Sequence, residues 1–463
     1  MSEDTRPRVV VAGATGFIGS ALGQALKDRV RLIGLTRSAR SEIDYYAEVR
    51  RVDLFSKSDT VRALEGADYA VYLVHSMMPS ARLVQANFED LDVLCAENFA
   101  QAAAENGVQH IVYVGGLQPS SGVLSRHLES RVEVERVLGG HGVSVTTLRA
   151  GLIVGGNGSS FQILRRLIER LPIMVCPSWT NTKTNPVSLT NVIWAIESVL
   201  QKPGSESRVF DVGSPKPLTY RELMATTARV MGVRRWFLPV PLVTPALSRL
   251  WVSVVTGAPK ALVGPLIASL RHEMIARKDP QYRLSGEPGT PIEDTLREAL
   301  LDGDHTKPPP RAFGKMSTAS ATPKVLSVQR MPIPRGRDAA WAATLYMRWL
   351  PDSMHGLMPI TVSQQDHQTF FRLWSWGPVL LQLERTISVG RQVFRITGGV
   401  LARPSDKGRL EFRTVLDGDT LIVAIHEYAP RLPWWLYCNS QALFHRWVMH
   451  RFGRFIARQA PVV

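Results

Sequence analysis

A glycine-rich turn between a strand and a helix is the feature that most constrains the fold of this chain. Residues 8–12 are the apolar run RVVVA, residues 13–19 read GATGFIG, and a periodic helix is expected over residues 20–27. Glycines in a G-x-x-G-x-x-G pattern let the backbone turn tightly and approach a pyrophosphate, while the helix N-terminus supplies amide donors. The pattern predicts a dinucleotide-binding turn formed by Gly13, Thr15, Gly16, Phe17, Ile18 and Gly19.

Further apolar strands alternate with helical segments over the first 150 residues. The expected strands cover residues 30–35, 52–54, 69–74, 110–114 and 143–149, and the clearest helix covers residues 87–106. Alternating apolar strands and helices predict an α/β fold with a parallel, doubly wound Rossmann sheet. Ligands of such sheets bind at the carboxyl ends of the strands.

Side chains that follow the expected strands are candidates for binding the nucleotide. Arg37, after the second strand, stands where an NAD enzyme would carry Asp or Glu, and it suits the extra phosphate of NADP. NADP is therefore expected as the cofactor in preference to NAD. We expect Asp53, next to Leu54, to accept from the adenine amine, and His75 and Gly115 to lie at the rim of the same pocket.

Several segments together resemble a known superfamily. These are GATGFIGS, LTRS, YLVHSM, ENFAQAAAENGVQHIVYVGGL and LRAGLIVG. They are similar to the atypical short-chain dehydrogenases/reductases, in the branch near NmrA-like and nucleoside-diphosphate-sugar epimerase-like proteins. They are also similar to the dinucleotide-binding accessory subunit of respiratory complex I. The resemblance spans roughly residues 8–300 and implies NAD(P) binding by residues 1–305.

The catalytic residues of that superfamily are not retained here. Its Ser or Thr, Tyr and Lys positions fall on Gly115-Gly116, His127 and Arg131. His127 and Arg131 are four residues apart on an expected helix, so both can face one side of it. Histidine can act as a general acid, and arginine can bind ribose hydroxyls.

Two functions stay open at this point. The chain is either an NADP-dependent oxidoreductase that uses His127 and Arg131, or a non-catalytic NADP(H)-binding sensor or structural protein. A solvated helix face is the simplest alternative for His127 and Arg131. A sugar-nucleotide epimerase fits less well, because that chemistry relies on the missing Tyr and Lys.

The middle region, residues 156–305, is expected to cover the substrate. Thr219 and Glu222 have the spacing of a capping box at a helix start. Residues 236–270 are strongly apolar but interrupted by five prolines, so no run is long enough for a membrane-spanning helix. This segment is expected to line an apolar substrate pocket, to lie in a membrane interface, or to be plain buried core.

Residues 306–324 have the composition of a linker, and residues 325–463 form a second domain. Strands are expected at residues 325–330, 360–363, 379–387, 392–397, 409–415 and 421–428, with Asp417-Gly418 as a hairpin turn. A helix over residues 339–350 and a closing helix over residues 435–459 complete a helix-grip, START-like α+β order that would enclose a cavity. The closing helix is expected to carry Phe444, Val448, Phe452 and Phe455 on one face, either as core or as a contact with anionic lipid.

The charge distribution bears on partners and location. The net charge is +15, and residues 327–463 hold 17 Lys and Arg against 9 Asp and Glu. No nucleic-acid module accompanies this charge, so a peripheral membrane contact is favoured over nucleic acid. Three scattered cysteines give no support to a disulfide framework or a metal site, and the polar residues 1–8 do not resemble a signal peptide. We expect a cytoplasmic protein, with the inner face of the membrane as an alternative location. The expected substrate is an apolar carbonyl compound of the quinone, isoprenoid or lipid type. The sequence leaves the oligomeric state open.

Overall fold

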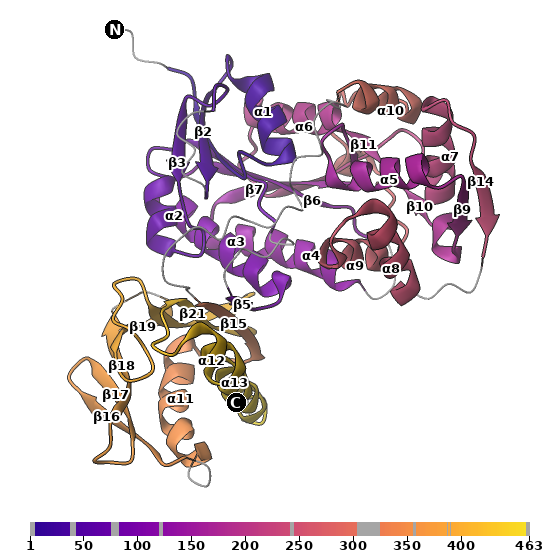
Figure 1. Ribbon diagram of the computed structural model, residues 1–463. Helices are drawn as coiled ribbons and strands as arrows, with labels where there is room; N and C mark the ends of the chain where they lie inside the picture. The colour runs from indigo at the N-terminus through magenta and orange to yellow at the C-terminus, as the bar shows by residue number, and fades with distance from the viewer. Residues whose placement is uncertain are drawn as a thin grey trace. The chain divides into compact units, whose positions relative to one another are not determined.

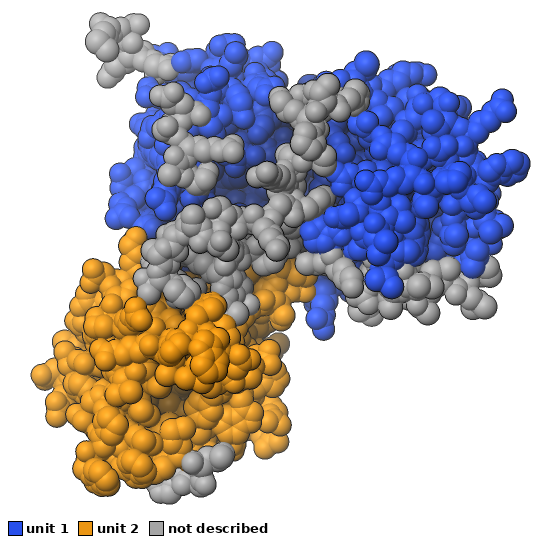
Figure 2. All heavy atoms as spheres, in the orientation of Figure 1, with its two compact units in different colours: residues 1–78, 95–314 blue, residues 79–94, 315–463 orange. Residues whose placement is uncertain are grey.

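The chain forms two units in a computed structural model, which describes residues 5–37, 43–75, 83–119, 124–240, 245–302, 325–354, 358–386, 388 and 390–459. Unit 1 contains residues 1–78 and 95–314, and unit 2 contains residues 79–94 and 315–463 (Figure 2). The expected linker, residues 306–324, lies outside the described residues. Residues 79–94 group with the C-terminal unit, which the domain boundaries expected from the sequence do not include.

Unit 1 is built on a seven-stranded parallel sheet. In pairing order its strands are β3 (Glu48–Arg51), β2 (Arg31–Thr36), β1 (Arg8–Ala12), β4 (Tyr69–Tyr72), β6 (His110–Gly116), β7 (Ser144–Ala150) and β12 (Arg208–Val212). The strand order reverses at β1, which lies between β2 and β4. This arrangement confirms the Rossmann-type, doubly wound α/β fold.

The expected position of the third strand was wrong. Strand β3 ends at Arg51, which is paired with Thr36 at the end of β2, and Val52 N–H still donates to the Thr36 carbonyl oxygen. Asp53 and Leu54 therefore follow the strand instead of lying within it. This places them at the carboxyl edge of the sheet, where ligands of this fold bind.

Helices cover both faces of the sheet (Figure 1). Helices α1 (Phe17–Leu26) and α6 (Leu189–Gln201) pack on one face, and α2 (Lys57–Ala63), α3 (Phe88–Glu105) and α4 (Arg126–Leu138) contribute to the other. Leu22 of α1 and Val192 of α6 are buried in the same apolar core as Val9 of strand β1. Burial on both faces explains why the strands are continuous apolar runs.

The remainder of unit 1 forms a second layer of short strands and helices. Its helices are α5 (Ser159–Arg170), α7 (Tyr220–Val230), α8 (Pro245–Thr256), α9 (Lys260–Ser269) and α10 (Ile292–Leu301), and its strands include β9 (Ile173–Cys176) paired with β14 (Trp236–Pro239). The expected capping box of Thr219 and Glu222 is confirmed at the start of α7. Among the described residues, no helix is long and apolar enough to cross a membrane.

Unit 2 contains an eight-stranded sheet that is antiparallel except at one edge. In pairing order the strands are β16 (Ile360–Gln365), β17 (Gln368–Leu373), β18 (Val379–Thr386), β19 (Arg391–Gly398), β20 (Arg409–Val415), β21 (Thr420–Tyr428), β15 (Val325–Pro332) and β5 (Leu83–Gln85). Helices α11 (Ala339–Met354), α12 (Trp434–Asn439) and α13 (Gln441–Ile456) share its core. Strand β17 was not expected, whereas the Asp417-Gly418 hairpin between β20 and β21 is confirmed. The assignment to a START-like family stays a prediction.

The closing helix differs from its expected form. It is two helices, because the backbone breaks at Ser440, with φ −131° and ψ −83°. Val448 and Phe452 are buried as expected, but Phe444 is exposed. The buried stripe of α13 also includes Ala442, Met449 and Ile456, which are seven residues, or about two helical turns, apart and so lie on the core side with Phe452.

The buried His110 should make the stability of unit 1 depend on pH. Its imidazole Nε2 lies 2.8 Å from Thr146 Oγ1 between β6 and β7, and burial lowers its pKa below the ordinary 6.5. The folded chain therefore keeps His110 neutral while the unfolded chain takes up a proton, so stability falls as the pH drops below that value. We expect His110→Gln, which can still bond to Thr146, to lose less stability than the natural protein between about pH 7.5 and about pH 5.5. Urea unfolding at both pH values measures this, and equal losses in the two proteins would contradict it.

Candidate functional site

The turn between β1 and α1 forms a cradle in which a side chain has no room. Gly13 has a φ of +92°, and a Cβ atom at this position would lie 3.2 Å from the carbonyl oxygen of Leu73. A Cβ atom at Gly19 would lie 2.3 Å from the Gly13 carbonyl oxygen, which is closer than real contacts allow. The Tyr46 hydroxyl donates to the Gly19 carbonyl oxygen at 2.8 Å, which fixes the end of the turn.

The same turn leaves donors available for an anion. Gly16 is the N-cap residue of α1, and no side chain caps the first turn of this helix. Thr15 and Gly16 are exposed, whereas the Phe17 ring lies against Gly155 and Ile18 packs on the core. A helix N-terminus reached through glycines fits a pyrophosphate, so the residues present suit a dinucleotide.

The candidate residues for the adenosine half follow neighbouring strands. Arg37 is exposed directly after β2. After β3, the Oδ1 atom of Asp53 accepts the backbone N–H of Phe55 at 3.2 Å, and the carbonyl oxygen of Leu54 accepts from Asn98 Nδ2 at 2.8 Å. These bonds hold the segment at the strand ends. They engage one oxygen of the Asp53 carboxylate.

Three candidate residues from distant parts of the chain come together beyond β4 and β6. His75 follows β4, and His127 and Arg131 lie on α4. Arg131 Nη2 is hydrogen bonded to His75 Nδ1, and the rings of His75 and His127 have centroids 5.4 Å apart. The expected pairing of His127 and Arg131 on one side of the helix therefore brings both to His75.

The bond between Arg131 and His75 determines the state of one imidazole. An arginine side chain can only donate hydrogen bonds, so Nδ1 of His75 must be the acceptor. The neutral His75 ring then carries its proton on Nε2, and a second proton would have to displace Arg131. Of the two imidazoles, His127 is the one that can deliver a proton without breaking this bond.

Neighbouring residues that the sequence reasoning missed hold α4 in place. Ser125 caps the helix, with its Oγ atom accepting the N–H of Leu128 at 3.4 Å. Tyr113 on β6 donates to the Arg131 carbonyl oxygen at 3.4 Å. A Cβ atom at Gly116 would lie 3.9 Å from Arg131 Cγ, so the end of β6 lies beside the guanidinium-bearing side chain. Ser125 could have been recognised as a cap from its place before the helix.

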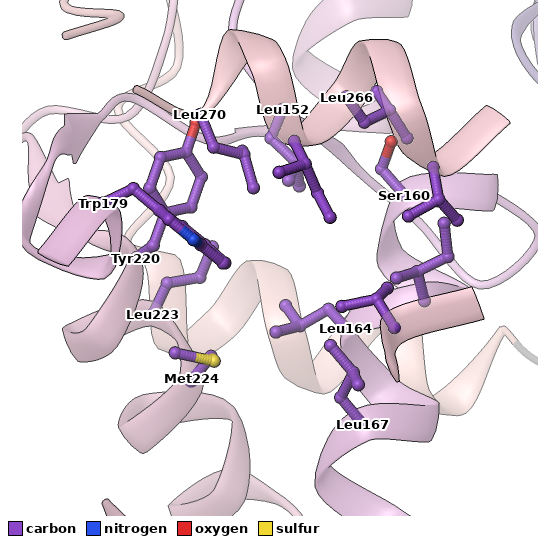
Figure 3. Close-up of a pocket in the computed structure, with 14 residues that line it drawn as sticks. Leu152, Ser160, Leu164, Leu167, Trp179, Tyr220, Leu223, Met224, Leu266 and Leu270 are labelled. Atoms are coloured by element: carbon purple, nitrogen blue, oxygen red, sulfur yellow. The ribbon is translucent and has the colours of Figure 1, made fainter. Parts of the chain in front are cut away.

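An apolar cavity of about 110 Å³ lies in the second layer of unit 1 (Figure 3). Its walls come from α5, α7, α8, α9 and the segments around Leu152 and Trp179. The polar groups on this wall are few: the Ser160 hydroxyl, the Trp179 indole and the Tyr220 phenol. Burial raises the pKa of Tyr220 to about 12, so its hydroxyl stays protonated at neutral pH. The cavity suits an apolar ligand.

One hydrogen bond connects this cavity wall to helix α4. The hydroxyl groups of Ser125 and Ser269 lie 2.9 Å apart, and Leu270 next to Ser269 lines the cavity. Val252, Val263 and Ile267 also line it, as the pocket interpretation of residues 236–270 expects. Other residues of that segment, such as Trp236 and Val254, are exposed.

Comparison with known proteins agrees with the nucleotide-binding turn. Residues 13–167 match a family model described as NAD(P)H-binding. The chain is 28% identical over 123 residues to the auxiliary protein GraX of Staphylococcus aureus, a match that covers 26% of this chain and 40% of that protein. It is 21% identical over 260 residues to UDP-glucose 4-epimerase of Vibrio cholerae, covering 50% of this chain and 79% of that protein.

Solved structures share the fold of unit 1 at low sequence identity. Triphenylmethane reductase of Citrobacter sp. superposes with a TM-score of 0.51 at 21% identity, covering 64% of this chain and 99% of that one. A nucleoside-diphosphate-sugar epimerase of Staphylococcus aureus gives 0.50 at 17%, covering 63% and 100%. An NADPH-dependent quinone oxidoreductase of Escherichia coli gives 0.50 at 17%, covering 63% and 99%.

Residues 13–167 thus match an NAD(P)H-binding family model, and they lie in a unit with a Rossmann-type fold. Proteins of similar fold include epimerases and reductases. These findings support a nicotinamide cofactor without deciding between NAD and NADP.

A methyl group at position 19 should weaken nucleotide binding. Gly19→Ala places a Cβ atom against the Gly13 carbonyl oxygen and the Ala14 backbone, so the turn must shift away from the approach a pyrophosphate needs. Gly140→Ala is the matched control, because nothing lies within 4 Å of a Cβ atom there. Titration with NADPH, followed by nucleotide fluorescence, should show a dissociation constant at least tenfold higher for Gly19→Ala only. This corresponds to a loss of about 1.4 kcal/mol in binding free energy. Unchanged affinity in Gly19→Ala would show that the turn is not the binding site.

Proposed function

We propose that this protein binds NADP(H) and reduces a carbonyl group of an apolar substrate, of the quinone, isoprenoid or lipid type. The observation that carries the proposal is the meeting of His75, His127 and Arg131 at the carboxyl edge of the sheet. This edge also carries the glycine turn, because Leu73, two residues before His75, donates its N–H to the Ala12 carbonyl oxygen. The nucleotide cradle and the proton-transfer candidates therefore share one edge of the sheet.

The nucleotide would be held at both ends by residues of unit 1. The glycine turn and the first turn of α1 receive the pyrophosphate, and Arg37 receives the 2′-phosphate that distinguishes NADP from NAD. Asp53 accepts from the adenine. The bound nucleotide supplies the hydride.

The chain itself supplies the proton. In the proposed mechanism His127 donates a ring proton to the oxygen of the substrate as negative charge develops there. Arg131 holds His75 in one tautomer, and the His75 ring in turn lies against His127. The positive guanidinium of Arg131 also stabilises negative charge near this group.

The substrate class follows from the apolar cavity and its link to α4. A cavity whose wall is almost entirely Leu, Ile, Val, Met and aromatic residues has little to offer a sugar nucleotide, whose hydroxyl groups need polar partners. This argues against an epimerase. Reduction of an apolar compound agrees with the quinone oxidoreductase and triphenylmethane reductase of similar fold, although their likeness extends to the fold alone.

A second candidate function is a non-catalytic NADP(H) sensor. The specific observation in its favour is that Gly115, Gly116, His127 and Arg131 stand where catalytic members of the resembling superfamily carry Ser or Thr, Tyr and Lys. The two functions differ in one measurable respect. A sensor needs only binding, whereas a reductase must oxidise NADPH when a substrate is present.

The first test combines nucleotide binding with turnover. We expect NADPH to bind more tightly than NADH, and Arg37→Ala to lose about tenfold in NADPH affinity while NADH affinity stays the same. With a panel of quinones and isoprenoid aldehydes, His127→Ala should lower kcat by at least a hundredfold and leave the dissociation constant of NADPH nearly unchanged. His141→Ala, a histidine elsewhere in unit 1 that pairs with Glu97, is the control. Tight NADPH binding with no oxidation of NADPH by any substrate would favour the sensor.

A second test fills the cavity. Val263 is 1% exposed on the cavity wall, so Val263→Phe should extend its ring into the open volume instead of into packed core. We expect KM for an apolar substrate to rise about tenfold or more while NADPH affinity is retained. Steady-state kinetics with the best quinone from the panel measures this. An unchanged KM would place the substrate outside this cavity.

A further inference from the structure

The exposed side of helices α12 and α13 in unit 2 has the character of a membrane-binding surface. Large apolar side chains are usually buried, and a cluster of them in solvent marks a contact site. Four such side chains lie on these two short helices and are defined here as the aromatic face: Trp435 (69% exposed), Leu443 (46%), Phe444 (36%) and Trp447 (38%).

The aromatic face is contiguous along α13. Leu443 and Phe444 lie four and three residues before Trp447, so both share one side of the helix with Trp447. The rings of Phe444 and Trp447 have centroids 5.7 Å apart. The opposite side of α13 is occupied by core residues such as Met449 and Phe452. The fold of unit 2 thus places the helix with one apolar side inward and a second apolar stretch outward.

Positive charge surrounds the aromatic face without any acidic residue near it in sequence. Residues 428–463 contain five arginines and no Asp or Glu. Arg446, Arg454 and Arg458 are exposed, and the guanidinium of Arg451 lies over the Trp447 ring, 4.9 Å from its centroid. Arginines beside tryptophans suit the boundary of an anionic membrane, where the rings enter the headgroup region and the guanidinium groups reach the phosphates.

We propose that the aromatic face and its arginines bind the surface of an anionic phospholipid bilayer. A single-stranded nucleic acid would also meet arginines and aromatic rings, but Leu443 offers nothing to a base or a phosphate. A second copy of the chain would bring five arginines of the same segment against each other, which is electrostatically unfavourable. An acidic, apolar surface satisfies both the charge and the exposed side chains.

This proposal does not depend on the proposed reductase activity. Vesicle binding can be measured on the full chain with neither nucleotide nor substrate present, so either proposal can fail alone. If both proposals hold, the protein would take up its apolar substrate at the membrane, where apolar compounds accumulate.

The test is co-sedimentation of the full-length protein with phospholipid vesicles. We expect binding to vesicles of equimolar phosphatidylcholine and phosphatidylglycerol, little binding to phosphatidylcholine alone, and weaker binding as salt is raised. Phe444→Ser with Trp447→Ser should reduce the partition coefficient about tenfold or more, and so should Arg446→Gln with Arg454→Gln. The arginine pair is exposed, so its variant tests the proposal even if the aromatic variant folds poorly.

Two control variants match these changes elsewhere. Trp236→Ser with Leu238→Ser removes exposed apolar side chains from β14 of unit 1, and Lys202→Gln with Lys216→Gln removes two exposed charges. Both should bind vesicles like the natural protein. The proposal is overturned if the anionic vesicles fail to sediment the protein, or if only the β14 variant loses binding. It is also overturned if the Phe444→Ser, Trp447→Ser variant loses affinity for an oligonucleotide but keeps its affinity for vesicles. The same holds if light scattering shows that the natural protein is a dimer and that this variant, which still binds vesicles, is a monomer.

Discussion

The close contact between the Gly13 turn and the end of β4 is the constraint on which the rest of unit 1 depends. A Cβ atom at position 13 would crowd Leu73, and a Cβ atom at position 19 would collide with the Gly13 carbonyl oxygen. Only glycine therefore fits at these two positions of the turn. The end of β4 lies beside β1, where the strand order reverses, and the Leu73 N–H donates to the Ala12 carbonyl oxygen just before the turn. Every candidate residue of the site, from Arg37 to Arg131, is positioned by a strand or helix that packs on this sheet.

Much of this arrangement was predictable because its signals are local. A glycine turn between apolar elements, a capping box at Thr219 and a hairpin at Asp417-Gly418 are each encoded within a few residues, and the structure contains all three. The errors arise where tertiary contacts decide. The closing helix was expected to be continuous, yet the chain breaks at Ser440, and Phe444 lies exposed while Val448 and Phe452 remain in the core.

Contacts between distant residues could not be predicted from a single sequence. The spacing of His127 and Arg131 indicates a shared side of a helix but does not indicate which residue they face. His75 lies 56 positions before Arg131, and Ser269 lies 144 positions after Ser125. The first contact makes His75 Nδ1 the acceptor of a hydrogen bond from Arg131, and the second joins the start of α4 to the wall of the apolar cavity.

The short strand β5 shows that unit 2 is not a single continuous stretch of the sequence, because residues 79–94 belong to it and lie between two parts of unit 1 in the sequence. Residues 83–85 pair with β15 in unit 2, the carbonyl oxygen of Gln85 accepts from Gln329, and Asp90 pairs with Arg330. A chain that began at residue 325 would lack this edge strand and leave the half-buried Arg330 without that carboxylate. Only residues 76–82 separate β5 from His75 in the sequence, so the segment that completes unit 2 comes shortly after a candidate residue of the site in unit 1. Unit 2 therefore has to be studied within the full chain.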